Sequence, residues 1–415
     1  MVKRVRFTML YTIKDYLLDS KNRAKVWIII IILSVTCFGV VTAASLDGVV
    51  WLDAGKNFFD ALSRGDFAAT HYSSRFGISV MWLYGLSFII ATVTSFSVVS
   101  ILTFMVYGFT VLCVFVLMHR VSRMAPTFPV YMVTSYLLLA PYVVATPIFL
   151  TWLDKILMVS TVLTILFWTE FLLVSCSLGT SRTRLIVLTG ISLGVALLTK
   201  PAGIILIPLL IAMTAYVLWR DKSFQVIKPL LFVFGLAGFV FFVFYPAMWV
   251  DPLGVLLSRI NSSDAQVELT IPFLMDNGFI RYMSNVVVVF LADLMFTVGV
   301  FMLAIDLYKA LYKKTLRTFI TPITFLGLSG LVYSLIVTFI AVFLVDRAFG
   351  NIVSPRYYAP IIPLVVLYPL NKLRNHKLVL SLAFIIQVYR LPLVRWALWV
   401  GFYLVTTSII RPPYW

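Results

Sequence analysis

Long apolar runs separated by short polar segments dominate the hydrophobic pattern of the chain. A helix that crosses the hydrocarbon core of a bilayer needs roughly 20 mostly apolar residues. The runs of suitable length predict an all-α, polytopic membrane protein with about 11 spanning helices. They lie near residues 26–45, 97–118, 127–146, 156–178, 185–199, 203–219, 229–247, 286–308, 319–345, 357–370 and 378–410.

The last of these runs leaves the count open. Arg390, Pro392 and Arg395 interrupt it, so it predicts either one helix with an interfacial piece or two short spans. The runs divide the chain into an N-terminal segment, 1–25, a transmembrane domain, 26–410, and a tail, 411–415.

Two connections between spans are unusually long, at 46–95 and 246–285. Long connections in a compact chain are usually functional. In the first, Leu52 to Leu62 places apolar residues near one face and charged residues on another, which predicts a helix lying in the membrane interface. Ile78 to Ile90 is apolar enough to dip into the bilayer and return.

The composition excludes a water-soluble domain. Hydrophobic residues make up 62% of the 415 residues and charged residues only 12%, whereas soluble domains are nearer half apolar and a quarter charged. The three cysteines all lie inside apolar runs and the three histidines are scattered, so neither a disulfide framework nor a metal site is indicated.

The net charge of +17 is a signal of topology. Lys and Arg concentrate in cytoplasmic loops of membrane proteins. The N-terminal segment is basic, and so is every second loop, which predicts a cytoplasmic N-terminus and contact with anionic lipid headgroups of the bilayer rather than with nucleic acid. The basic loop residues are Arg120, Arg123, Arg182, Arg184, Arg220, Lys222, Lys228, Lys309, Lys313, Lys314, Arg317, Lys372, Arg374 and Lys377.

Most acidic residues fall in the opposite loops, which places the two long connections outside the cytoplasm. Asp47 lies where the first span leaves the membrane. A partly desolvated carboxylate there suits a base for an acceptor hydroxyl, although a solvated juxtamembrane Asp has the same sequence signature. Glu170 lies within a span, and we interpret it as a hydrogen-bonded structural residue facing the bundle. We expect Asp306 to pair with Lys309 or Lys313.

Cations on the outer side run against the charge rule, so each needs local compensation. Lys200 lies at a tight turn between two spans, Arg356 opens a span, and Arg75 lies in the first loop. A lipid phosphate or an Asp partner would supply that compensation. Lys155, next to Asp154, fits a salt-bridge or interface residue.

Five segments, in order along the chain, together resemble one family. Segment 47–82 resembles the first periplasmic loop of lipid-carrier-dependent glycosyltransferases with the GT-C fold, within which the group related to protein O-mannosyltransferases and lipid A aminoarabinose transferases is the most similar. Segment 151–154 resembles that family's second acidic position, and 193–201 its Gly-x-Ala-x-Leu-Thr-Lys turn. Segment 245–252 resembles its Pro-Ala-x-Trp-x-Asp-Pro motif, and 354–363 its Arg-Tyr-x-x-Pro segment.

The resemblance implies a GT-C-type bundle and transfer of a sugar from a polyprenyl-phosphate donor to a lipid, glycan or protein acceptor at the extracytoplasmic face. It puts Asp47 in the role of general base, with inversion at the anomeric carbon, and Asp154 beside it as a second catalytic carboxylate. No cofactor is required, and a divalent cation is compatible. The implied substrate-binding residues are Lys200, Arg356, Arg75, Asp53, Tyr357 and Trp249.

Two departures and two alternatives accompany this interpretation. The family's Asp-Glu is Asp47-Gly48 here, and its frequent His-Pro is Arg75-Phe76. These departures keep a catalytically degenerate relative open as an alternative. The other alternative is a transporter or flippase of lipid-linked sugars, although two related halves, which are typical of transporters, are not evident in the sequence.

Overall fold

A computed structural model describes residues 46–71, 77–140, 152–173, 181–257, 294–343 and 359–376. In these ranges all regular elements are α-helices or short 3₁₀-helices, which confirms the predicted all-α class. In chain order they are α3 (Leu46–Ser63), η1 (Ala68–Thr70), α4 (Ile78–Val93), α5 (Val98–Met124), α6 (Val130–Leu139), α8 (Trp152–Leu173), α9 (Arg182–Thr199), η2 (Pro201–Ile205), α10 (Leu206–Asp221), η3 (Phe224–Val226), α11 (Ile227–Val243), α12 (Ala247–Val250), α15 (Leu294–Tyr312), α16 (Leu316–Phe319), α17 (Pro322–Phe343), η5 (Ala359–Ile361) and α18 (Ile362–Lys372).

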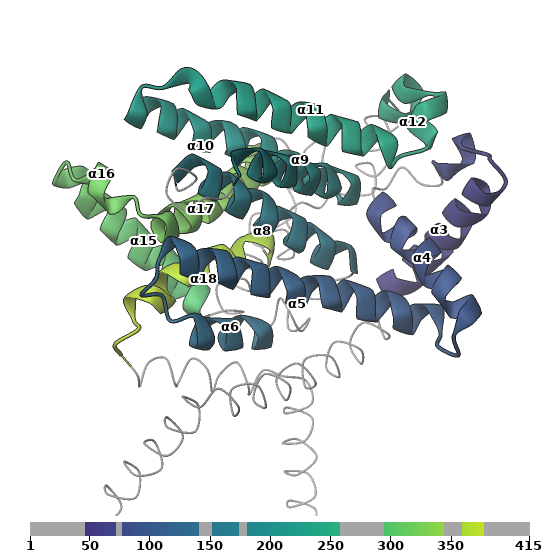
Figure 1. Ribbon diagram of the computed structural model, residues 1–415, viewed down its shortest axis with the longest axis horizontal. Coiled ribbons are helices and arrows are strands. Elements are labelled where there is room, and N and C mark those ends of the chain that lie inside the picture. Colours follow the sequence, from purple (N-terminus) through teal and green to yellow (C-terminus); the bar gives the residue numbers. More distant parts are fainter. Residues whose placement is uncertain are drawn as a thin grey trace, which may run out of the picture.

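Helix α8 is the central element of the bundle (Figure 1). Nineteen of its 22 residues are buried, and it packs against α4, α5, α9, α10 and α17. Two of its hydroxyl side chains bond within the helix: Ser160 donates to the carbonyl of Ile156 at 2.8 Å, and Thr164 donates to the carbonyl of Ser160 at 2.7 Å. In a helix buried on all sides, such internal bonds replace the water that the hydroxyl groups have lost.

Six helices in the described ranges are long and apolar enough to cross a membrane. They are Val98–Met124, Trp152–Leu173, Arg182–Thr199, Ala202–Asp221, Phe224–Val243 and Met295–Tyr312. Large apolar side chains are exposed on the outer helices, among them Phe104, Phe239 and Phe301, each at least 60% accessible. Exposed apolar surface of this kind is stable in contact with lipid. The chain is therefore a multi-pass membrane protein, as predicted.

One predicted span differs from the structure. In the described part of the run near 127–146 the structure has α6, a helix of 10 residues that ends at Leu139, and residues 141–146 lie outside the described residues. Ala140 is extended, with ψ of 147°, and Pro141 follows it. A residue before proline disfavours the helical region, so the helix ends there although the apolar run continues. The runs at 26–45 and 378–410 lie outside the described residues, so the count of about 11 stays a prediction.

The predicted basic loops lie together at one end of the bundle, which we call the basic end (Arg120, Arg220, Arg317, Lys372 and Arg374). Arg317 donates to the carbonyl of Arg220 at 3.3 Å. Arg374 donates to the hydroxyl of Thr127, in the loop after α5, at 2.9 Å. Loops far apart in sequence are thus neighbours in space, as the charge pattern requires.

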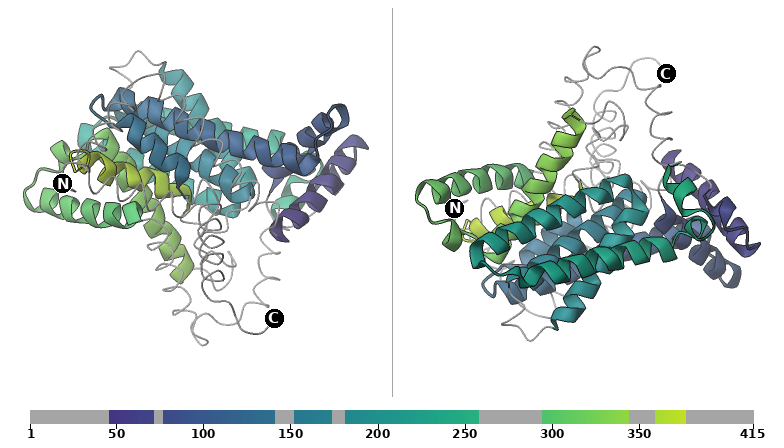
Figure 2. Two further views of the ribbon diagram at one scale, coloured as in Figure 1. Left: turned by 90° about the horizontal axis from the view of Figure 1, so that it is seen from below. Right: turned by 90° about the horizontal axis from the view of Figure 1, so that it is seen from above.

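The first long connection forms two helices at the opposite end of the bundle. Helix α3 contains the predicted amphipathic segment, and α4 contains the predicted apolar one. The two pack against each other, and α4 also packs against α5, α8 and α9. Both helices lie beyond the ends of the long helices, next to α12, in each view of Figure 1 and Figure 2.

Candidate functional site at the motif end

The end of the bundle opposite the basic end gathers described residues from four of the five segments that carry the family resemblance. We call it the motif end (Phe67, Trp152, Asp154, Lys200 and Trp249). A buried apolar cluster joins its elements, with members from α3, α4, α5, α8, α9, α11 and α12. Segments separated by as many as 190 residues in the sequence therefore share one packed core, and their polar groups are brought together by it.

An ion pair between Asp154 and Lys200 lies at the centre of the motif end. Asp154 is in the first turn of α8, and Lys200 follows the last residue of α9. The Lys200 Nζ donates to Asp154 Oδ1 in a very close contact. Asp154 is 1% exposed and Lys200 is 7% exposed. Of the two sources of compensation that the sequence left open for Lys200, the structure supplies the Asp partner.

The turn that presents Lys200 depends on Gly203. A Cβ at this position would lie 2.4 Å from the carbonyl oxygen of Ala196, which is backbone and has no freedom to move aside. Glycine is thus required where η2 folds back against the end of α9. Within α9, Gly194 lets α11 approach closely: a Cβ at this position would lie 2.6 Å from the Val240 side chain. The glycines of this segment therefore fix the position of the cation.

Hydrogen bonds connect the first outer connection to the same turn. Ser79 Oγ, near the start of α4, lies 2.9 Å from Thr199 Oγ1, which immediately precedes Lys200. Trp82 Nε1, also on α4, donates to the carbonyl of Phe244 at 2.8 Å. Helix α4 thus bridges the ends of α9 and α11, and it holds the first connection against the site.

A second set of contacts joins the Gly-Asp-Phe end of α3 to the Pro-Ala-x-Trp motif. The rings of Phe67 and Trp249 meet edge to face, with centroids 5.1 Å apart. His71 Nδ1 lies 2.5 Å from the hydroxyl of Tyr245, a fully buried residue. Trp249 Nε1 donates to the carbonyl of Phe242 at 2.9 Å. The indole of Trp249 is thus held in place, and its side chain remains 44% exposed.

Asp251, the acid of that motif, has a structural role. Its Oδ1 accepts the backbone N–H of Gly254 at 2.8 Å. An Asp followed by proline at the start of a turn is a typical N-cap, because the carboxylate satisfies an N–H group that lacks a partner within the turn. The motif therefore contains a capping carboxylate beside an aromatic anchor.

The predicted site residues divide into three groups. Asp154, Lys200 and Trp249 lie at the motif end. Asp53 is exposed on α3. The backbone of Asp47 belongs to the first turn of α3, and its side chain lies outside the described residues, as do Arg75, Arg356 and Tyr357. Element η5, which begins two residues after Tyr357, packs against α8.

Burial distinguishes two residues of the motif end that the sequence pattern did not. Lys155, expected to be a salt-bridge or interface residue, has no exposed surface and lies next to Asp154. Trp152, which the apolar pattern did not distinguish from other tryptophans of the outer loops, is 2% exposed and part of the buried cluster. Only burial separates these residues from their neighbours, and burial is a tertiary property.

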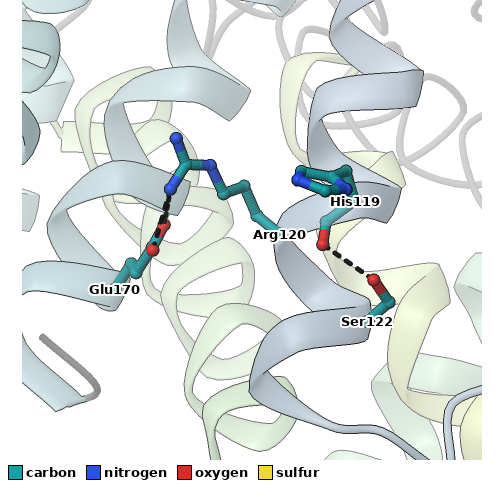
Figure 3. Close-up of polar contacts among 4 residues, drawn as sticks. All are labelled: His119, Arg120, Ser122 and Glu170. Carbon is teal, nitrogen blue, oxygen red and sulfur yellow. Dashed lines mark hydrogen bonds and ion pairs between the residues drawn. The ribbon is translucent and has the colours of Figure 1, made fainter. Parts of the chain in front are cut away.

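A second buried carboxylate lies near the other end of α8 (Figure 3). Arg120 Nη1 on α5 contacts both oxygens of Glu170, at 3.0 and 3.3 Å. This places Glu170 as a paired residue facing the bundle, as interpreted from the sequence. The expectation for Asp306 was wrong: it pairs with Lys372 at 3.2 Å and accepts from the Tyr368 hydroxyl at 2.6 Å. Helix α18 lies alongside α15 and supplies both partners, which no sequence spacing reveals.

Within the described ranges, no three His, Cys, Asp or Glu side chains are grouped as a metal site would need. The charged centre at the motif end is the Asp154–Lys200 pair with Lys155 beside it.

The chain is similar in structure to ArnT. The matches are crystal structures of ArnT from Cupriavidus metallidurans, in the apo state with 17% sequence identity and bound to undecaprenyl phosphate with 18%. Each has a TM-score of 0.49 and covers 85% of this chain and 60% of the other. The chain thus spans less than two thirds of those structures. No protein-family model matches it, and no curated protein does.

Proposed function

We propose that the chain is an integral membrane glycosyltransferase, which moves a sugar from a polyprenyl-phosphate donor to an acceptor hydroxyl at the extracytoplasmic face. The observation that carries the proposal is the buried contact between Asp154 and Lys200. These residues belong to two separate segments of the family pattern. Two further segments of that pattern meet at the same end of the bundle, through Phe67 and Trp249.

The proposed reaction is a single displacement. The acceptor oxygen forms a bond to the anomeric carbon while the bond from that carbon to the phosphate oxygen of the carrier breaks. The electron pair leaves with the polyprenyl phosphate, and the acceptor proton passes to the carboxylate of Asp47. Because a phosphate is a good leaving group, the reaction needs a base and cations rather than a strong acid.

Lys200 is the proposed cation for the departing phosphate, with Arg356 and Arg75 as further candidates. An ammonium group has three N–H donors, so its contact with Asp154 is compatible with a phosphate contact. Asp154 holds the ammonium in place before substrate binds, which reduces the reorganisation needed during reaction. The buried position of both groups strengthens their effect, because the effective dielectric constant is low there.

The proposed face follows from the charges. The described parts of the basic loops lie at one end of the bundle, and the motif end lies at the other. If basic loops face the cytoplasm, the site faces outward. Within the motif end we propose that Asp53, Tyr357 and Trp249 contact the sugar or the acceptor, which is a lipid, a glycan or a protein.

The direct test is transfer by the purified protein. The wild-type chain is incubated with radiolabelled polyprenyl-phosphate hexose and pentose donors and with candidate lipid, glycan and peptide acceptors, with divalent cation or with chelator. We expect label in an acceptor for one donor class. Asp47→Asn should reduce transfer by at least about 100-fold, the range of a lost general base.

The matched control is Asp60→Asn, since Asp60 is exposed on the same helix and takes no part in the proposed reaction. It should transfer at the wild-type rate. Transfer that survives in Asp47→Asn would remove Asp47 from the base role. A wild-type protein that moves lipid-linked sugar across vesicles but transfers none would support the transporter alternative. Binding without either activity would support a degenerate relative.

A further inference from the structure

Trp152 differs from Trp82, Trp168 and Trp249 in the hydrogen bonding of its indole N–H. Trp82, Trp168 and Trp249 each donate their indole N–H to an oxygen, at 2.8, 3.2 and 2.9 Å. The indole of Trp152 is 2% exposed, and its Nε1 has no hydrogen-bond acceptor in the described parts of the chain. A buried N–H without an acceptor loses its hydration and gains nothing in exchange.

Rotation of the Trp152 side chain does not bring its N–H to an acceptor. A few hydroxyl groups also lack partners, such as those of Thr161 and Thr169 on the same helix. A threonine hydroxyl is able to reach the carbonyl four residues earlier by changing one torsion angle. An indole has a single N–H in the plane of a large ring, and the packed cluster around Trp152 fixes that ring. The donor therefore needs an acceptor from outside the described chain.

The surroundings of Trp152 favour an anionic acceptor. The residue begins α8, a helix of 22 residues whose N-terminal N–H groups and dipole attract negative charge. Lys155 lies three residues after Trp152, on the same face of α8. Asp154, which bonds Lys200, belongs to the same first turn of α8. Two lysine side chains close to the indole N–H favour a negatively charged ligand there, and a phosphate oxygen is a strong acceptor.

We propose that the indole N–H of Trp152 donates a hydrogen bond to a phosphate oxygen of the bound lipid carrier. This rests on the proposed function and names a further binding residue for it. Trp152 is thus part of the phosphate site from the α8 side, and Lys200 is part of it from the α9 side.

The test compares Trp152→Phe with Trp168→Phe in purified protein. Both changes remove one indole N–H from the same helix, but the N–H of Trp168 already bonds Thr214. The measurements are the melting temperature without ligand and the affinity for undecaprenyl phosphate, with undecaprenol as the probe that lacks phosphate. Benzothienylalanine at position 152, which replaces N–H by sulfur at nearly constant volume, separates loss of the donor from loss of ring size.

For Trp152→Phe and for benzothienylalanine we expect an unchanged or higher melting temperature and about tenfold weaker binding of undecaprenyl phosphate, as for a lost hydrogen bond to a charged group. Binding of undecaprenol should change by less than about twofold, because no phosphate contact is involved. Trp168→Phe should melt at a lower temperature and bind both lipids as the wild type does.

Three outcomes would overturn the proposal. The first is wild-type affinity for undecaprenyl phosphate in the benzothienylalanine protein. The second is an equal loss of affinity for both lipids, which would indicate a packing role. In either case the proposed function stands, because the wild type binds the phosphate. The third is a wild-type protein that does not bind undecaprenyl phosphate, which would overturn the proposed function together with this proposal.

Discussion

Helix α8 has a buried carboxylate near each end, and the two ends use it differently. At the basic end Glu170 bonds Arg120, and the neighbouring Trp168 donates to Thr214. At the motif end Asp154 bonds Lys200, but Trp152 in the same turn has no described acceptor. Both carboxylates are 1% exposed. The two ion pairs are thus equally buried at their carboxylates, and the ends differ in the neighbouring indole, whose N–H is bonded at the basic end and has no described acceptor at the motif end.

The largest expected difference, in both stability and transfer, is between removing the cation of one ion pair and removing the cation of the other. Lys200→Met leaves Asp154 buried and uncompensated, which should destabilise the protein by about 3–5 kcal/mol and abolish transfer. Arg120→Met should destabilise less, because the Arg120 side chain is 20% exposed, and the folded fraction should transfer normally. The measurements are thermal melting in detergent and transfer per folded molecule.

The double variants sharpen this contrast. Removing both charges, as Asp154→Asn with Lys200→Met or Glu170→Gln with Arg120→Met, should restore most of the stability at either end, since no unpaired charge remains. Transfer per folded molecule should be normal in the double variant of Arg120 and Glu170 and absent in the double variant of Asp154 and Lys200. Activity in the double variant at the motif end would show that both of its charges are structural.

Substitution of Gly203 or Gly108 should have a smaller effect on stability. Gly203→Ala places a Cβ against the backbone of Ala196 and should cost about 1–3 kcal/mol. Gly108→Ala, on α5 with open space around the added Cβ, should stabilise by about 0.5–1 kcal/mol. The two are compared by thermal melting. A harmless Gly203→Ala would contradict the tight turn that presents Lys200.

Two variants of Asp251 distinguish a capping role of its carboxylate from a direct role in the reaction. Asp251→Ala should cost about 1 kcal/mol through loss of the cap, whereas Asp251→Asn keeps an acceptor oxygen and should melt near the wild type. Asp251→Asn should also retain transfer. If this variant folds but is inactive, the carboxylate has a direct role in the reaction.

The smallest effects come from single hydrogen bonds, one at each end. Tyr368→Phe at the basic end removes a bond to the carboxylate of Asp306 and should cost about 1.5–3 kcal/mol, and Ser79→Ala at the motif end removes a neutral bond and should cost about 1 kcal/mol. Only Ser79→Ala should change KM, because Thr199, its partner, precedes Lys200. Equal KM values for both variants and the wild type would mean that the α4 bridge does not position the site.

Much of the fold followed from the pattern of apolar residues. The helices α5, α8, α9, α10 and α11 begin and end within a few residues of the predicted runs. The error at α6 came from reading hydropathy across Pro141, where the backbone preference of the residue before proline ended the helix. The amphipathic segment of the first connection forms the predicted helix, α3, because that signal is local. Ile78 to Ile90, predicted to dip into the bilayer and return, instead lies in one continuous helix, α4.

The candidate site was predictable only in part. Asp154 and Lys200 were selected from motifs, but their contact joins residues 46 apart and depends on how α8 packs on α9. The partner of Asp306 was predicted wrongly for the same reason, since the nearest lysines in the sequence are not its partner in space. Trp152 gave no signal, because a tryptophan at a helix start has the same sequence pattern whether its N–H is bonded or not.

The sequence by itself determined that the chain is helical and spans a membrane, and it determined which loops lie together, because hydropathy and charge act on each segment separately in lipid and at its surface. The tertiary structure alone decided which charges pair and which donor is left without an acceptor. Those properties arise when side chains from distant segments compete for the same buried volume, and no single segment contains that information.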